Sequence, residues 1–129
     1  MNRKINTLYF SATGTTKKVV TEVANRVAND FKTTVKENDF TLPGAREKAL
    51  SFTNKDVVVV GVPVIAGRVP NVLLKCLNSI KGNNALAIAV VVYGNRNYDD
   101  ALIELKDILE SDGLKVIAGG AFIGEHSFS

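Results

Sequence analysis

The chain has 129 residues, of which 46% are hydrophobic and 22% charged, the composition of an ordinary folded domain with a net charge of +3. A single cysteine excludes an internal disulfide and any iron–sulfur cluster held by this chain alone, and a single histidine excludes a multi-histidine metal site. The apolar stretches are strand-length and the N-terminus has no secretory signal, so we expect one cytoplasmic domain over residues 1–129, with no membrane partner.

The first half of the chain alternates apolar runs with helical patterns. A β-type run covers residues 5–10, and apolar residues spaced by three and four predict a helix over 15–31. An edge strand is expected at 33–40 and a short helical turn at 45–50. The β-branched run at 56–62 is continuous, which is typical of a strand buried on both faces.

The second half continues the alternation. A helix is predicted over 71–80, a doubly buried strand over 85–93, a helix over 98–111 that stops at Gly113, and a final strand over 114–123. This order predicts an α/β fold, a doubly wound parallel sheet with right-handed crossovers. In such sheets the ligand binds outside the carboxyl ends of the strands.

The loop after the first strand has the composition of a phosphate cradle. Residues 11–16 read Ser-Ala-Thr-Gly-Thr-Thr and lead directly into a helix. A helix N-terminus attracts anions, the hydroxyls add uncharged donors, and Gly14 lets the backbone close around a phosphate. Neither a Walker loop nor the three-glycine dinucleotide pattern is present. The alternative interpretation is a plain N-cap, for which one Ser or Thr suffices.

The segment Tyr9-Phe10-Ser11-Ala12-Thr13-Gly14-Thr15-Thr16 resembles the phosphate loop by which flavodoxins hold flavin mononucleotide (FMN), whose pattern is Ser/Thr-x-Thr-Gly-x-Thr. The element order matches that family over essentially the whole chain. The resemblance implies a flavodoxin-like, five-stranded parallel sheet with strand order 2-1-3-4-5. A complete flavodoxin unit ends with a fifth helix, and we expect this chain to lack it, as a domain truncated at its C-terminus would.

The resemblance also implies a set of flavin-binding residues in three loops: Ser11, Ala12, Thr13, Gly14, Thr15, Thr16, Pro63, Val64, Ile65, Ala66, Gly67, Tyr93, Gly94, Asn95, Arg96, Asn97 and Tyr98. Within this set, Tyr98 stacks on the ring or, alternatively, packs on the sheet. The residues 64–66 offer an aliphatic wall on the other side of the ring.

Arg96 departs from typical flavodoxins, which keep acidic residues near the flavin. A guanidinium near the ring would favour the anionic reduced flavin and raise its potential. Arg68 could act likewise, or both arginines point to solvent. His126 follows the last strand and either lines the same pocket or belongs to a frayed terminus, whereas Cys76 is expected to be a buried structural thiol.

Residues 92–102 and 122–129 are similar to the flavodoxin-like N-terminal domain of proteins that fuse a flavodoxin to a ferredoxin. This resemblance implies electron transfer, with a ferredoxin-type iron–sulfur domain or another redox protein as partner. Two other functions stay open, an FMN-dependent NAD(P)H or quinone-type reductase and an interaction domain that keeps the fold without flavin. The final strand lacks a helix to cover one face, which predicts a homodimer.

Charge is distributed unevenly along the chain. Residues 1–50 contain nine basic and five acidic residues, whereas residues 99–112 contain one basic and six acidic residues. Lys17 and Lys18 lie beside the phosphate loop, where they can balance a phosphate dianion. The basic residues form no dense stripe and accompany no recognition motif, so we expect no nucleic-acid partner.

Overall fold

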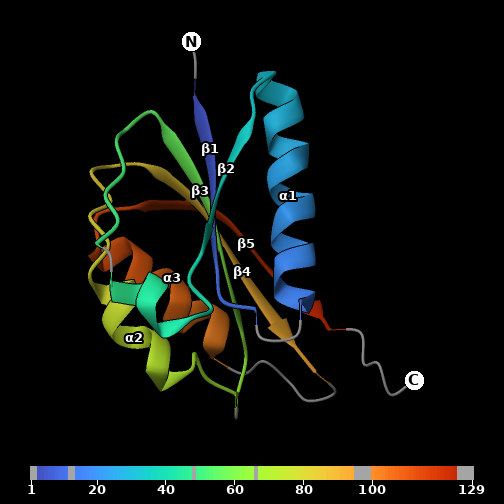
Figure 1. The fold of residues 1–129 in the computed structure, drawn as a ribbon, viewed down its shortest axis with the longest axis vertical. Helices are drawn as coiled ribbons and strands as arrows, with labels where there is room; N and C mark the ends of the chain where they lie inside the picture. The colour runs from blue at the N-terminus through green and yellow to red at the C-terminus, as the bar shows by residue number, and fades with distance from the viewer. Residues whose placement is uncertain (1–2, 12–13, 48, 66, 95–99, 125–129) are drawn as a thin grey trace.

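The computed structural model describes residues 3–11, 14–47, 49–65, 67–94 and 100–124. Within these ranges the elements follow in the order β1 (Lys4–Tyr9), α1 (Thr15–Phe31), β2 (Val35–Asp39), the short 3-10 helix η1 (Pro43–Glu47), β3 (Asp56–Pro63), α2 (Asn71–Asn78), β4 (Leu86–Tyr93), α3 (Ala101–Ser111) and β5 (Lys115–Ile123). The strands pair in parallel in one sheet of order β2-β1-β3-β4-β5, which confirms the predicted fold class (Figure 1).

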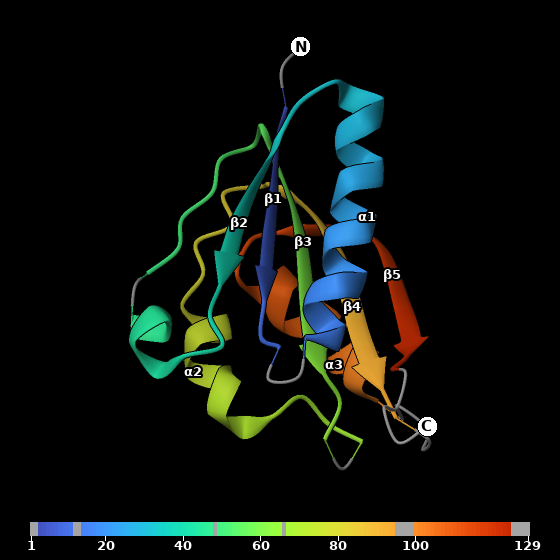
Figure 2. The ribbon, with the colours of Figure 1, turned by 45° about the vertical axis from the view of Figure 1, so that its right-hand side comes forward.

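The two central strands carry the core on both faces of the sheet. In β3, Val58 and Val60 pack with the side chains of α2 and α3, while Val57 and Val59 pack with α1. This alternation explains why the run is apolar at every position, because each face has its own helix layer. Figure 2 shows α1 on one side of the sheet, with α2 and α3 on the other.

Gly61 sets how closely α1 approaches the sheet. A Cβ atom built on Gly61 would stand 2.1 Å from Cγ2 of Val20 and 3.3 Å from Cγ2 of Thr16. Any larger residue at position 61 would therefore push α1 outwards. The glycine in the middle of the β-branched run holds the first turns of α1 against the carboxyl half of β3.

β3 is covered by helices on both faces, whereas β5 is not. α3 packs against β4 and β5, whereas most contacts of α1 with the sheet lie on β1, β2, β3 and β4. Ile117, Phe122 and Ile123 are 58%, 38% and 68% exposed. The strand is apolar yet open to solvent, and no helix follows it within the described residues. The predicted absence of a last helix thus agrees with the part of the chain that the structure describes.

Element boundaries differ slightly from those predicted. The helical turn lies at Pro43–Glu47 rather than 45–50, and α3 begins at Ala101, three residues after the predicted start. Gly113 follows α3 with φ +92°, the left-handed conformation expected of a helix stop. Among the described residues, no helix combines the length and apolar character that crossing a bilayer requires.

Candidate functional site

Three loops begin at the carboxyl edge of the sheet. They follow β1, β3 and β4, which are neighbours in the sheet and point the same way, so the loops emerge side by side (Figures 1 and 2). This edge is where open parallel sheets bind their ligands. The topology therefore brings together the three segments that the sequence singled out.

The loop after β1 is anchored by Ser11. The Ser11 hydroxyl accepts a hydrogen bond from the backbone N–H of Lys17 at 3.0 Å. The backbone N–H of Ser11 donates to Oγ1 of Thr41 at 2.8 Å. Ser11 thereby caps the first turn of α1, although the N-cap position itself is Gly14, which has no side-chain cap. One hydroxyl of the loop thus serves the capping role.

Gly14 and the threonines complete the described part of this loop. Gly14 has φ +92°, and a Cβ built on it would meet nothing within 4 Å, so the glycine is required by its backbone conformation rather than by crowding. Thr16 is 3% exposed and faces β3, whereas Thr15 is half-buried. Ala12 and Thr13, also predicted site residues, lie outside the described residues.

The charges around the N-terminus of α1 are unusual for a helix. Its first turn contains no acidic residue, and it places Lys17 and Lys18 where the helix dipole is positive. Lys17 lies 3.8 Å from a carboxylate oxygen of Glu37 on β2, and both side chains are about half exposed. Lys18 is exposed. The concentration of positive charge at this helix end suits an anion.

Glu37 also accepts a hydrogen bond from the hydroxyl of Tyr9, at the carboxyl end of β1. Burial, followed by this bond and the nearby charge of Asp39, raises the pKa of the tyrosine hydroxyl above its ordinary value. Tyr9 therefore stays neutral and fastens the edge strand β2 beside the phosphate-type loop. No local pattern in the sequence indicates this pair, because the partners are 28 residues apart.

The loop after β3 makes a tight turn. Val64 donates its N–H to the carbonyl of Val92 on β4 at 2.9 Å, which extends the sheet by one bond. Ile65 and Arg68 then exchange two backbone hydrogen bonds of 3.0 Å across a turn in which Gly67 has φ +78°. Val64 is half-buried and Ile65 is 58% exposed, so an apolar side chain faces outward here. Ala66 lies outside the described residues.

Arg68 is engaged by α3. Its Nε and Nη2 donate to the two carboxylate oxygens of Glu104 at 3.0 and 3.1 Å, and the N–H of Val69 donates to Glu104 at 3.0 Å. The hydrogen bond from Arg68 lowers the pKa of Glu104 and raises that of the guanidinium. Neither sequence-based alternative for Arg68, a place near the ring or one in solvent, includes this ion pair.

The loop after β4 is described only at its start. Tyr93 ends the strand and accepts the N–H of Gly124 at 2.6 Å, which brings the end of β5 to this edge. Five predicted residues lie outside the described part of the chain: Asn95, Arg96, Asn97, Tyr98 and His126. Their roles stay predictions.

Cys76 fits its predicted structural role. The thiol is buried on the core side of α2, and burial raises its pKa, an effect that Arg46 partly offsets. A protonated, buried thiol is inert as a nucleophile.

No protein-family model and no curated protein matches the chain. Solved structures do match it. A flavoprotein from Lactobacillus acidophilus, in complex with FMN, has a TM-score of 0.64 at 16% identity, with 93% of each chain covered. The two-electron reduced flavodoxin of Megasphaera elsdenii has a TM-score of 0.64 at 18% identity, over 92% of this chain and 85% of that one. The Streptococcus pneumonia TIGR4 flavodoxin has a TM-score of 0.66 at 13% identity, over 96% and 88%.

This chain has the flavodoxin-like fold. The identities are low, so the likeness concerns the fold alone, and the site must be argued from this chain's own residues. The narrower resemblance to the N-terminal domain of flavodoxin–ferredoxin fusions stays a prediction.

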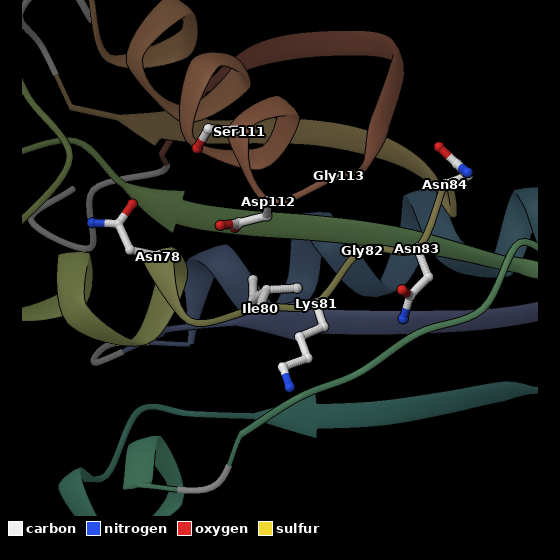
Figure 3. A pocket seen from close by; sticks show the side chains of 9 residues that line it. All are labelled: Asn78, Ile80, Lys81, Gly82, Asn83, Asn84, Ser111, Asp112 and Gly113. Atoms are coloured by element: carbon white, nitrogen blue, oxygen red, sulfur yellow. The ribbon is translucent and has the colours of Figure 1, made fainter.

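A hollow of about 430 Å³ lies at the opposite, amino end of β4 and β5, where the flavodoxin-like fold has its short connecting turns (Figure 3). Asp112 contributes one buried carboxylate oxygen without a hydrogen-bond partner in the described structure, and burial raises its pKa to about 6. In Figure 3 the Lys81 side chain points away from Asp112, and the Asn83 amide instead donates to the carbonyl of Phe52 at 2.8 Å. This hollow is remote from the three loops and is not part of the candidate site.

Proposed function

We propose that this chain binds FMN non-covalently at the carboxyl edge of its sheet and serves as an electron-transfer domain. The observation that carries the proposal is the loop after β1. It combines hydroxyl side chains, a glycine with positive φ and a lysine-flanked helix N-terminus, at the edge where two further loops meet. The fold relative from Lactobacillus acidophilus, which is in complex with FMN, supports the choice of ligand.

The residues present fit the phosphate end of such a cofactor. Thr15, together with the N–H groups at the start of α1, would donate to the phosphate, and Lys18 would balance its charge. Ser11 shapes the loop by bonding Lys17. A dianion at this place would remove the conflict between the lysines and the helix dipole, so the local charge pattern is explained by the ligand.

The loop after β3 fits the ring end. An isoalloxazine ring needs an apolar face and backbone donors, and Ile65 offers an exposed aliphatic side chain beside the turn at Gly67. When bound, FMN supplies reversible one- and two-electron chemistry, and the protein's part is to bind it, to orient it and to tune its potential. We infer that the partner is an iron–sulfur domain or another redox protein, as the sequence resemblance implies.

Titration of the purified chain with FMN tests the proposal, with riboflavin, which lacks the phosphate, as the matched ligand. We expect saturable binding of FMN, seen as a change in flavin absorbance and fluorescence, with riboflavin binding at least about tenfold more weakly. Equal affinities would contradict the phosphate assignment. A chain that binds neither ligand would overturn the function and leave a domain that keeps the fold without flavin.

A further inference from the structure

Glu104 accepts three hydrogen bonds from the loop after β3. Its carboxylate accepts Nε and Nη2 of Arg68 at 3.0 and 3.1 Å and the N–H of Val69 at 3.0 Å. Two of these bonds form the bidentate pairing of guanidinium with carboxylate, which fixes orientation as well as distance. The loop after β3 is therefore bonded to α3 at two successive residues.

The two partners differ in their access to solvent. The Arg68 side chain is 67% exposed, but that of Glu104 is only 18% exposed, and Val69 is 2% exposed. Without the carboxylate, the N–H of Val69 would lose its partner in a largely buried place, which is costly. The bond to Val69, more than the exposed ion pair, therefore gives the contact its stability.

Glu104 also stands at a structural junction. It lies in the first turn of α3, where an acidic residue interacts favourably with the helix dipole. α3 begins soon after the loop that follows β4, at Ala101. One side chain thus joins the loop after β3 to the helix that leads out of the loop after β4, and these are the two loops proposed to flank the flavin ring.

We propose that Glu104 is a positioning residue of the FMN site: its carboxylate fixes Arg68 and Val69 against α3 and so presets the apolar wall that Ile65 offers the ring. This inference rests on the proposed function. The wall is formed before the ligand arrives, which lowers the ordering cost of binding. Because the tether acts at the ring end, it affects FMN and riboflavin alike, unlike a residue that contacts the phosphate.

The test compares Glu104→Ala and Glu104→Gln with the wild type, and uses Glu110→Ala, an exposed acid on the same helix, as the matched control. We expect Glu104→Ala to raise the dissociation constants of FMN and of riboflavin by about the same factor, roughly tenfold. Glu104→Gln keeps an acceptor for Val69 and should lose less. Glu110→Ala should bind as the wild type does.

Amide hydrogen exchange without ligand supplies the second readout. We expect faster exchange at Val69 and its neighbours in Glu104→Ala, and an unchanged rate in Glu110→Ala. If wild-type affinity and exchange persist in a folded Glu104→Ala, the inference is overturned. A rise in the FMN constant alone would also overturn it, since that would mean that Glu104 acts on the phosphate end and not on the wall for the ring. Failure of the wild type to bind either ligand would instead overturn the proposed function, and this inference with it.

Discussion

α1 and α3 each carry, at one end, charges of the sign that a helix dipole disfavours. α1 carries Lys17 and Lys18 near its start and has no acidic residue in its first turn. α3 carries Glu110 and the C-cap Asp112 at its end and has no basic residue in its last turn. The first conflict lies at the carboxyl edge of the sheet, beside a loop built of hydroxyls and glycine. The second lies at the opposite end, in a hollow whose carboxylate has a buried oxygen without a partner in the described structure.

The two helix ends differ in what surrounds the disfavoured charge. At α1 the proposed anionic ligand would resolve the conflict, and the surrounding residues would supply donors for that ligand. At α3 the described residues supply no cation to Asp112, so the charge is a net cost to stability. The same physical sign therefore indicates a binding site in one helix and a stability defect in the other.

The largest effect is expected from a substitution that moves α1 off the sheet. Gly61→Ala would place a Cβ atom 2.1 Å from Cγ2 of Val20, and the helix must shift to make room. We expect the free energy of unfolding to fall by about 1–3 kcal/mol, measured by urea denaturation. Gly44→Ala is the control, because a Cβ there meets nothing within 4 Å. Equal stability of both variants would contradict this account of how α1 is placed.

At the end of α3, Asp112→Asn should stabilise the protein at neutral pH. The folded-state pKa of about 6 lies above the ordinary value of 3.8. The folded state therefore binds the proton more tightly, and stability falls as the pH rises from about 4 to about 6. Because the carboxyl is partly exposed, we expect about 1 kcal/mol rather than the full shift.

The measurement is the free energy of unfolding of the wild type and Asp112→Asn at several pH values between 4 and 7. The variant should lose the fall in stability that the wild type shows over this range. Asp107→Asn, an exposed acid on the same helix, should retain it. A wild-type profile in Asp112→Asn would show that the carboxylate finds a partner in solution.

At the start of α1, Lys18→Glu should have opposite effects on folding and on binding. An acid in this position suits the helix dipole, so the ligand-free protein should gain about 0.3–1 kcal/mol. The same change repels a phosphate, so FMN affinity should fall by about two- to fivefold while riboflavin affinity stays constant. Arg26→Glu makes an identical charge change on the same helix, two turns away, and should leave the ratio of the two affinities unchanged. A loss of stability in Lys18→Glu without a loss of FMN affinity would contradict an anion site at the start of α1.

The fold could be predicted from the sequence, because the patterns that indicate each strand and helix are local. The continuous valines of β3 and the spaced valines of α1 identify a buried parallel strand and an amphipathic helix without reference to any partner. The loop of residues 11–16 was likewise identifiable, since its composition exceeds the needs of a cap.

The tertiary contacts of the site escaped prediction because they join residues far apart in the chain. Glu104 meets Arg68 across 36 residues, and an acid on an amphipathic helix looks the same whether it is solvated or bonded. Gly61 lies within an apolar run, and nothing in the run indicates why this position needs a glycine. The close approach of α1 explains it. The burial of Asp112 depends on how two turns pack together.

The smallest change in stability is expected from a substitution at an edge of the sheet. β2, at one edge, carries Lys36, Glu37 and Asp39, charges that discourage pairing with another chain. β5, at the other edge, has no charged residue after Lys115 and exposes Ile117, the extra residue of a β-bulge. The sequence-based expectation of a homodimer concerns this strand, whose exposed apolar face a second copy of this chain would cover.

Ile117→Lys tests this expectation with little cost to the fold, because the side chain is 58% exposed. We expect the free energy of unfolding to change by no more than about 0.5 kcal/mol. In sedimentation experiments at increasing concentration, the wild type should form a dimer and the variant should stay monomeric. Ile103→Lys, which alters an equally exposed isoleucine on α3, should dimerise as the wild type does. A wild type that stays monomeric at the highest concentration would show that the bulge and the twist of β5 protect this edge without any charge.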